Sequence, residues 1–167
     1  LHTLGVNGGY RQQDVTELAR ILTGWSVEQN SFLFRPERHD PYAKRFLFQQ
    51  VNPSGQDEGL KILEQLASHS STARFIARKF AVRFVSDRPP ASLELCLSRA
   101  FQRSQGNSQA MIEALLQSPE FWKKEHVGAK IKSPLELLAS SLRILDARLS
   151  PDSELAQYLG RMGQELY

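Results

Sequence analysis

The stretch from Ser71 to Val85, STARFIARKFAVRFV, decides the fold that the sequence predicts. On a helix that turns about 100° per residue, its apolar residues fall on two opposite sides. One side carries Ala73, Ala77, Phe80 and Phe84, and the other carries Phe75 and Val82. A helix that is apolar on two faces packs on both. The segment is therefore expected to be a central helix between two layers.

Four cations lie on the flanks of this predicted helix, with Arg74 and Arg78 on one flank and Lys79 and Arg83 on the other. Packing on both faces would limit their access to water, and partly buried cations need partners. Internal carboxylates are the favoured partners, from Glu17, Glu64, Glu94 or Glu113. The alternative partner is an anionic ligand such as phosphate or sulfate. The four cations are therefore candidate anion-binding residues.

Helical spacing of apolar residues continues on both sides of this segment. Helices are expected from about residue 12, over 57–69, and near 91–104 and 108–117, with two more beginning at Ser133-Pro134 and Ser150-Pro151. Cys96 is expected to be buried as a small apolar side chain beside Leu93 and Leu97. The predicted class is mostly α, as a multi-helix bundle or stacked helix pairs.

Residues 31–51 interrupt the helical pattern. The short aromatic-rich runs at 31–34 and 45–51 favour strands, and Asp40-Pro41 between them favours a turn. The sequence therefore predicts one small β-hairpin inserted at about residues 31–51, with a polar tip.

Three residues of this predicted tip are candidate catalytic residues, namely His39, Asp40 and Lys44. A histidine can act as acid, base or ligand near neutral pH, and an aspartate can orient its ring. The favoured alternative is a turn held by hydrogen bonds from the Asp40 side chain. No metal site is expected, because no second histidine has ligand spacing with His39.

Composition narrows the classes of function. The 167 residues fit one domain with a sizeable core, and no apolar run is long enough for a membrane span. Lys and Arg exceed Asp and Glu by 21 to 18, an excess too small to indicate nucleic-acid binding. No cofactor is expected. The polar, basic residues 123–132 are expected to form a flexible loop.

A family resemblance is carried by five blocks of sequence: 1–10, 14–20, 22–25, 38–41 with Lys44, and 67–79. Together they are similar to the bacterial family called domain of unknown function 1800, over most of the chain. Two positions depart from it: Arg11 stands where members commonly have a capping Thr, and Asn7 where they often have Asp. The resemblance implies a longer, exported protein of which this chain is an internal fragment, in the periplasm or outside the cell. It transfers no catalytic role.

Two functions remain open at this point. The first is a non-catalytic helical module that binds another exported protein or an envelope polymer. The alternative is part of a hydrolase-like enzyme site that uses His39 and Asp40 with residues outside this chain.

Overall fold

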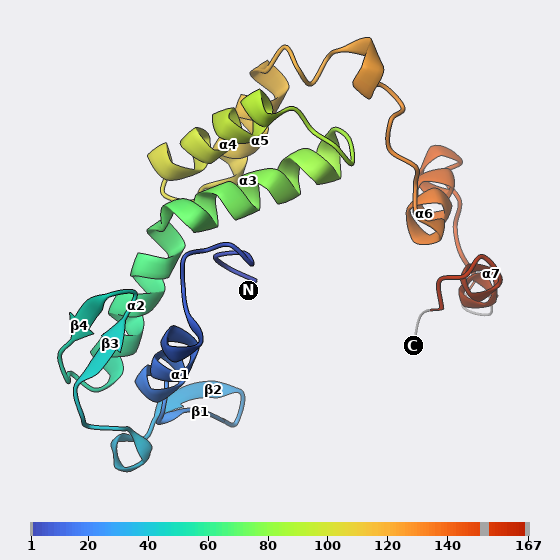
Figure 1. Ribbon diagram of the computed structural model, residues 1–167. Coiled ribbons are helices and arrows are strands. Elements are labelled where there is room, and N and C mark those ends of the chain that lie inside the picture. The colour runs from blue at the N-terminus through green and yellow to red at the C-terminus, as the bar shows by residue number, and fades with distance from the viewer. Residues whose placement is uncertain (1, 151–153, 166–167) are drawn as a thin grey trace. The chain divides into compact units, whose positions relative to one another are not determined.

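The computed structural model describes residues 2–150 and 154–165. The chain divides into two compact units, the first ending at Lys123 and the second beginning at Lys124. The single domain expected from the sequence stays a prediction. Helices dominate both units (Figure 1), which confirms the mostly α class.

The first unit contains α1 (Gln12–Ile21), α2 (Gln56–Ser68), α3 (Ser70–Phe84), α4 (Ala91–Arg103), α5 (Ser108–Gln117) and a 3-10 turn at Pro36–Arg38. The helices expected near 91–104 and 108–117 are confirmed. Asn107 begins α5, because its side-chain oxygen accepts hydrogen bonds from the backbone N–H groups of Gln109 and Ala110. Arg11 precedes α1 and makes no side-chain capping hydrogen bond.

The larger core lies where α3 packs on α4, and α4 on α5 (Figure 1). Ala73, Ala77 and Ala81 of α3 are fully buried. Their four-residue spacing makes a small-residue stripe that lets Leu93 and Leu97 of α4 approach closely. The predicted buried face is confirmed for Ala73, Ala77 and Phe80, but it is wrong for Phe84, which is exposed, and Ala81 belongs to the buried stripe instead.

The opposite side of α3 is covered less completely than predicted. Phe75 and Val82 are both half-buried. Phe75 lies under the turn at Gly5, where an added Cβ would come within 2.9 Å of its ring. A loop from the N-terminal segment therefore covers part of the face that was expected to meet a second layer.

Cys96 is exposed, so the prediction that it is buried is wrong. The buried stripe of α4 runs through Leu93, Leu97, Ser98 and Phe101. Cys96 falls beside that stripe, because the face that meets α3 advances by four residues from Leu93.

Two hairpins replace the single one expected at residues 31–51. Strand β1 (Trp25–Glu28) pairs antiparallel with β2 (Ser31–Phe34), and β3 (Lys44–Phe46) pairs antiparallel with β4 (Gln49–Val51). The strands themselves were predicted in part, but the pairing of 31–34 with 45–51 is wrong.

The turns explain the difference. Gln29 and Asn30 have φ of 48° and 61°, and Leu47 and Phe48 have φ of 45° and 66°. Two successive residues with positive φ make the two-residue turn that matches the twist of a hairpin. Each pair of strands therefore closes locally, and His39 and Asp40 lie between the hairpins instead of at a tip.

A second core joins the hairpins to the helices. Leu4, Ile21, Phe46, Ile62 and Leu66 form it, so that α1, β3 and α2 surround a common apolar centre.

Trp25 packs directly on the backbone of α2. A Cβ added at Gly59 would lie 2.5 Å from Cζ2 of the indole ring, so only a glycine permits this approach. The neighbouring residue on α2 is Glu58, which is 1% exposed.

The second unit contains a 3-10 turn at Lys124–His126, then α6 (Pro134–Ile144) and α7 (Leu155–Arg161). The predicted start of α6 is confirmed: Ser133 and Glu136 exchange side-chain to backbone hydrogen bonds. The start predicted at Ser150-Pro151 falls largely outside the described residues. The flexibility of 123–132 stays a prediction. None of the described helices combines the length and the apolar character that crossing a membrane requires.

Candidate functional site

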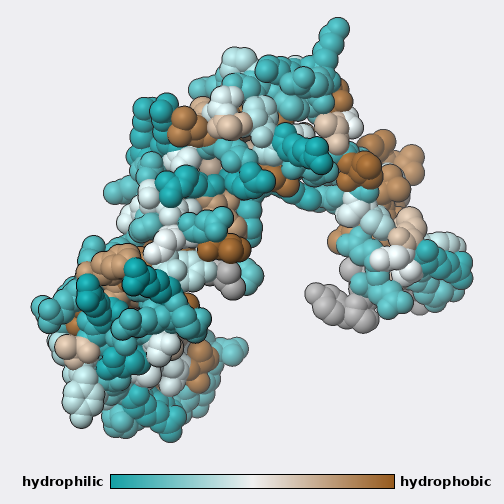
Figure 2. Space-filling view, viewed as in Figure 1, coloured by the Kyte–Doolittle hydropathy of each residue, from teal (hydrophilic) through white to brown (hydrophobic). Residues whose placement is uncertain are grey.

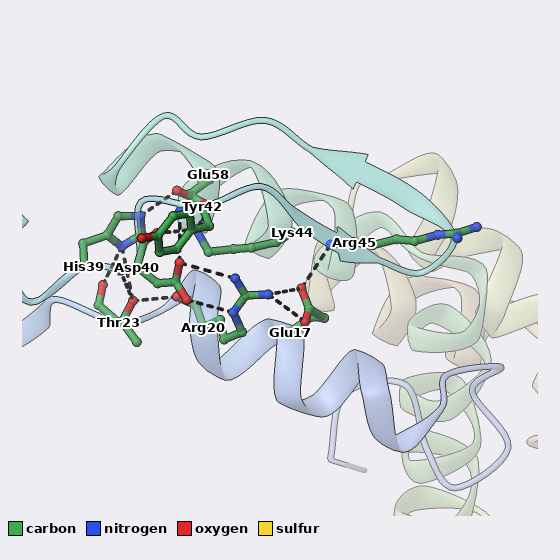
Figure 3. Close-up of polar contacts among 9 residues, drawn as sticks. All are labelled: Glu17, Arg20, Thr23, His39, Asp40, Tyr42, Lys44, Arg45 and Glu58. Atoms are coloured by element: carbon green, nitrogen blue, oxygen red, sulfur yellow. Dashed lines mark hydrogen bonds and ion pairs between the residues drawn. The ribbon is translucent and has the colours of Figure 1, made fainter.

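Polar residues recur every third position along α1 and its end. Glu17 and Arg20 share one side of the helix, because positions three apart are neighbours on a helix surface, and Asp14 and Thr23 continue the row at its two ends. This side faces the segment that leads into β3, as Figure 3 shows for Glu17, Arg20 and Thr23. An ion network extends from it to α2.

Arg20 is the bridge at the partly exposed end of the network. Its Nε donates to Oδ2 of Asp40 at 2.8 Å, and its Nη1 donates to Glu17 at 2.9 Å. Glu17 Oε2 in turn accepts the backbone N–H of Arg45 at 3.1 Å. Arg20 therefore connects α1 to the Asp40 end of the segment from Asp40 to Arg45, and Glu17 connects α1 to its Arg45 end (Figure 3).

The charges of this bridge shift the carboxyl groups. Hydrogen bonds from Arg20, and then from the backbone N–H of Tyr42, lower the pKa of Asp40 to about 2. Hydrogen bonds from Arg20 and from the N–H of Arg45 also hold the pKa of Glu17 below its usual value. The two carboxylates raise the pKa of Arg20 in return.

Thr23 holds the segment before β3 against the end of α1. Its hydroxyl donates to the carbonyl of Arg20 at 2.6 Å and accepts the N–H of Asp40 at 2.8 Å. Its own carbonyl accepts a hydrogen bond from Nδ1 of His39 at 2.9 Å. The next residue, Gly24, has φ of 84° and approaches the carbonyl of Arg35 too closely for a side chain. Thr23 and Gly24 together set the position of the His39 ring.

The buried end of the network is a triad of His39, Lys44 and Glu58. Oε1 of Glu58 lies 2.6 Å from Nε2 of His39, and its Oε2 lies 2.9 Å from Nζ of Lys44. The side chains of Glu58 and Lys44 are 0% exposed and that of His39 is 6% exposed. Nζ of Lys44 also donates to the carbonyl of Asp40 at 2.5 Å. This buried ion triad is the most enclosed polar feature in the described part of the first unit (Figure 3).

The hydrogen bonds assign a proton to the His39–Glu58 contact. A carbonyl only accepts, so Nδ1 of His39 donates to Thr23. Nε2 then meets a carboxylate oxygen at 2.6 Å, and two lone pairs at this distance need a proton between them. Lys44 is paired with Glu58, and Arg20 with Glu17 and Asp40, while His39 and Glu58 share the proton between them. The buried charges are therefore paired.

The sequence-predicted candidates His39, Asp40 and Lys44 are thus brought together, but as members of this network. Their catalytic role stays a prediction. Sequence reasoning missed Glu58 altogether and the link of Arg20 to Asp40. The three-residue spacing of polar positions along α1 was a signal from which the role of Arg20 could have been predicted.

The four candidate anion-binding residues of α3 are exposed. Arg78 pairs with Glu94 at 2.9 Å, one of the partners expected from the sequence. Arg74 donates to the hydroxyl of Ser71, and Nζ of Lys79 lies 4.7 Å from the ring centroid of Phe75. The expectation that these side chains are partly buried is wrong, because the N-terminal loop covers α3 only locally. Anion binding stays a prediction.

Two open hollows accompany these features. One, of about 230 Å³, lies beside Arg74 and Arg78 and the loop at 4–7. The other, of about 470 Å³, lies between α1 and the β3–β4 hairpin and is lined by Gln13, Glu17, Ala43, Lys44, Arg45, Phe48 and Gln50. Across residues 2–150 and 154–165, no group of three or more His, Cys, Asp or Glu side chains is placed to hold a metal ion.

A family model described as "Protein of unknown function (DUF1800)" matches residues 1–167. No curated protein and no solved structure matches the chain significantly.

Proposed function

The chain belongs to the DUF1800 family of proteins of unknown function, and within that family we propose that it is a helical binding module of an exported bacterial protein. In this proposal the ion network is a structural lock that fixes a binding surface. The partner is another exported protein or a polymer of the cell envelope.

One observation carries the proposal: the His39 ring has no nitrogen left for a substrate. Nδ1 donates to the Thr23 carbonyl, Nε2 contacts Glu58, and the ring is 6% exposed. A general acid or base must place a nitrogen within hydrogen-bond reach of the reacting atom. The enzyme alternative would require His39 to leave both partners and expose the charges of Glu58 and Lys44.

The network also has the properties of a scaffold. Its bonds join α1, the segment before β3, and the first turn of α2, and one of these bonds spans 28 residues of sequence. Binding residues are commonly displayed on loops that a rigid scaffold positions. The visible face of the first unit is mostly hydrophilic with scattered apolar side chains (Figure 2).

Exposed apolar residues on the β1–β2 hairpin support a binding role as well. Val27 is 76% exposed and Phe32 is 51% exposed. Both lie on the hairpin that Trp25 anchors by packing on Gly59. Large apolar side chains in water are typical of surfaces that bind partners when they occur together.

His39→Gln and Asp40→Asn separate a lock from a catalytic site. We expect both variants to unfold at a lower urea concentration than the unmodified chain. At temperatures where they remain folded, both should bind isolated envelope protein or envelope polysaccharide as well as the unmodified chain does, in a cosedimentation assay. Hydrolysis of ester, phosphate or glycoside substrates by the unmodified chain, abolished in a folded His39→Gln variant, would establish the enzyme alternative.

Export is tested separately. The full-length protein, produced in a bacterium with its own N-terminus and detected after cell fractionation, should appear in the periplasm or the medium. Retention in the cytoplasm would contradict this part of the proposal.

A further inference from the structure

The hollow between α1 and the β3–β4 hairpin has the size of a ligand site. Its volume of about 470 Å³ falls within the roughly 300–1,000 Å³ that small-molecule sites occupy. Two residues of α1, Gln13 and Glu17, form one wall, and residues of the hairpin and the segment before it form the other. The ion network fixes the distance between these walls, since Glu17 accepts the N–H of Arg45 across the groove.

The polar lining of this groove mixes donors with acceptors. The amides of Gln13 and Gln50 both donate and accept, the guanidinium of Arg45 donates, and the Glu17 carboxylate accepts. The Arg45 side chain extends away from the network (Figure 3), and only its backbone N–H is engaged within the described structure. A ligand rich in hydroxyl groups matches such a mixture, because each hydroxyl both donates and accepts. A simple anion would instead be met by donors alone.

An aromatic ring completes the groove. Phe48 is 61% exposed, and the guanidinium of Arg11 lies 5.3 Å from its ring centroid. The face of such a ring supplies apolar surface beside the polar groups, as in most ligand pockets.

Phe48 lies in a turn whose backbone conformation is energetically unfavourable. Leu47 and Phe48 have φ of 45° and 66°, a left-handed conformation that is unfavourable for large side chains. Oδ1 of Asp14 accepts the N–H of Leu47 at 2.8 Å and holds the turn against α1. Strain of this kind gathers at ligand sites, where the surrounding structure imposes it.

From these contacts we infer that the groove binds a saccharide, with a sugar ring on the face of Phe48 and its hydroxyl groups on Gln13, Glu17, Arg45 and Gln50. This inference rests on the proposed binding function and names the ligand class for it. Among the partners proposed above, it selects the envelope polymer.

Soluble oligosaccharides test the inference directly. The probes are neutral and acidic oligomers of hexoses and N-acetylhexosamines, titrated into the chain by calorimetry and by amide NMR. We expect at least one oligomer to bind and to shift the signals of Gln13, Arg45 and Gln50. Phe48→Asn should weaken binding about tenfold or more without unfolding the turn, since Asn tolerates positive φ. Gln50→Ala should also weaken it.

Phe84→Ala is the matched control, because Phe84 is a half-exposed aromatic residue on α3 and does not line the groove. It should leave affinity unchanged. Binding that Phe48→Asn and Gln50→Ala do not weaken would overturn the assignment of the groove. Binding of an envelope protein but of no oligosaccharide would overturn the saccharide inference and leave the binding module standing. Binding of neither would overturn both.

Discussion

One carboxylate contacts two buried side chains: Oε1 of Glu58 lies 2.6 Å from Nε2 of His39, and Oε2 lies 2.9 Å from Nζ of Lys44. Glu58 stands in the first turn of α2, where the helix macrodipole favours negative charge. Both partners of Glu58 come from the segment that immediately precedes and begins β3. Both of these polar attachments to α2 therefore depend on the single side chain of Glu58.

Glu58→Gln is expected to destabilise the protein severely. The substitution leaves Lys44 fully buried without its anion, and breaking a buried ion pair on one side costs about 3–5 kcal/mol. Urea unfolding followed by circular dichroism measures the loss. Glu64→Gln is the matched control, since Glu64 is an exposed residue of the same helix. A loss below about 1 kcal/mol, as for a surface pair, would show that the triad does not lock the fold.

Lys44 and Glu58 should be energetically coupled. Lys44→Met alone leaves Glu58 with one partner, and adding Glu58→Gln then removes a carboxylate that has already lost its lysine. We expect the double variant to lose about 0.5–3 kcal/mol less than the sum of the single losses. A double-mutant cycle from urea unfolding measures this. Additive losses would mean that the pair seen here contributes nothing specific.

Gly59→Ala should destabilise, against the usual preference of helices for alanine. An exposed Gly→Ala change inside a helix raises the free energy of unfolding by about 1 kcal/mol. At Gly59 the new Cβ would lie 2.5 Å from Cζ2 of Trp25, and such overpacking costs about 1–3 kcal/mol. At Gly160 of α7 the nearest atom would be 3.5 Å away, so Gly160→Ala should keep the usual gain. Thermal unfolding of the two variants should shift in opposite directions, and a gain at Gly59 would contradict the packing of Trp25.

Asp40 should make the stability fall at low pH. Its ordinary pKa of 3.8 drops to about 2 in the folded chain, because Arg20 bonds to the ionised form. The unfolded chain therefore binds this proton first as the pH falls. The stabilisation is present above about pH 4 and is lost as the pH approaches about 2.

NMR titration of the Asp40 carboxyl carbon measures this shift. Arg20→Gln should raise the pKa of Asp40 back towards 3.8. Arg103→Gln removes one positive charge at an exposed position on α4 and should leave the lowered pKa of Asp40 unchanged. An unchanged pKa of Asp40 in Arg20→Gln would show that the hydrogen bond from Arg20 does not lower it.

The helices could be predicted because their signals are local. Apolar spacing and caps placed α3, α4 and α5 close to their observed bounds. The pairing of strands could not be predicted in the same way, since the turn at Leu47-Phe48 contains neither Gly nor Asn, the usual signals for positive φ. It is held by Asp14, which lies 33 residues away in sequence.

The candidate site was predicted only in part for the same reason. The sequence places His39, Asp40 and Lys44 together, but an exposed tip and a buried triad have the same local pattern. The difference lies in Glu58, which is 19 residues from His39 and resembles an ordinary first-turn acid of a helix. Its two buried partners, His39 and Lys44, both come from outside α2.

Because Glu58 contacts both His39 and Lys44, the three positions of the triad form an epistatic unit. Loss of the Glu58 carboxylate leaves both His39 and Lys44 without this partner. Loss of either His39 or Lys44 leaves Glu58 still bonded to the remaining one. Homologues are therefore expected to keep all three residues or to replace them jointly with apolar ones, and covariation should be strongest between Lys44 and Glu58.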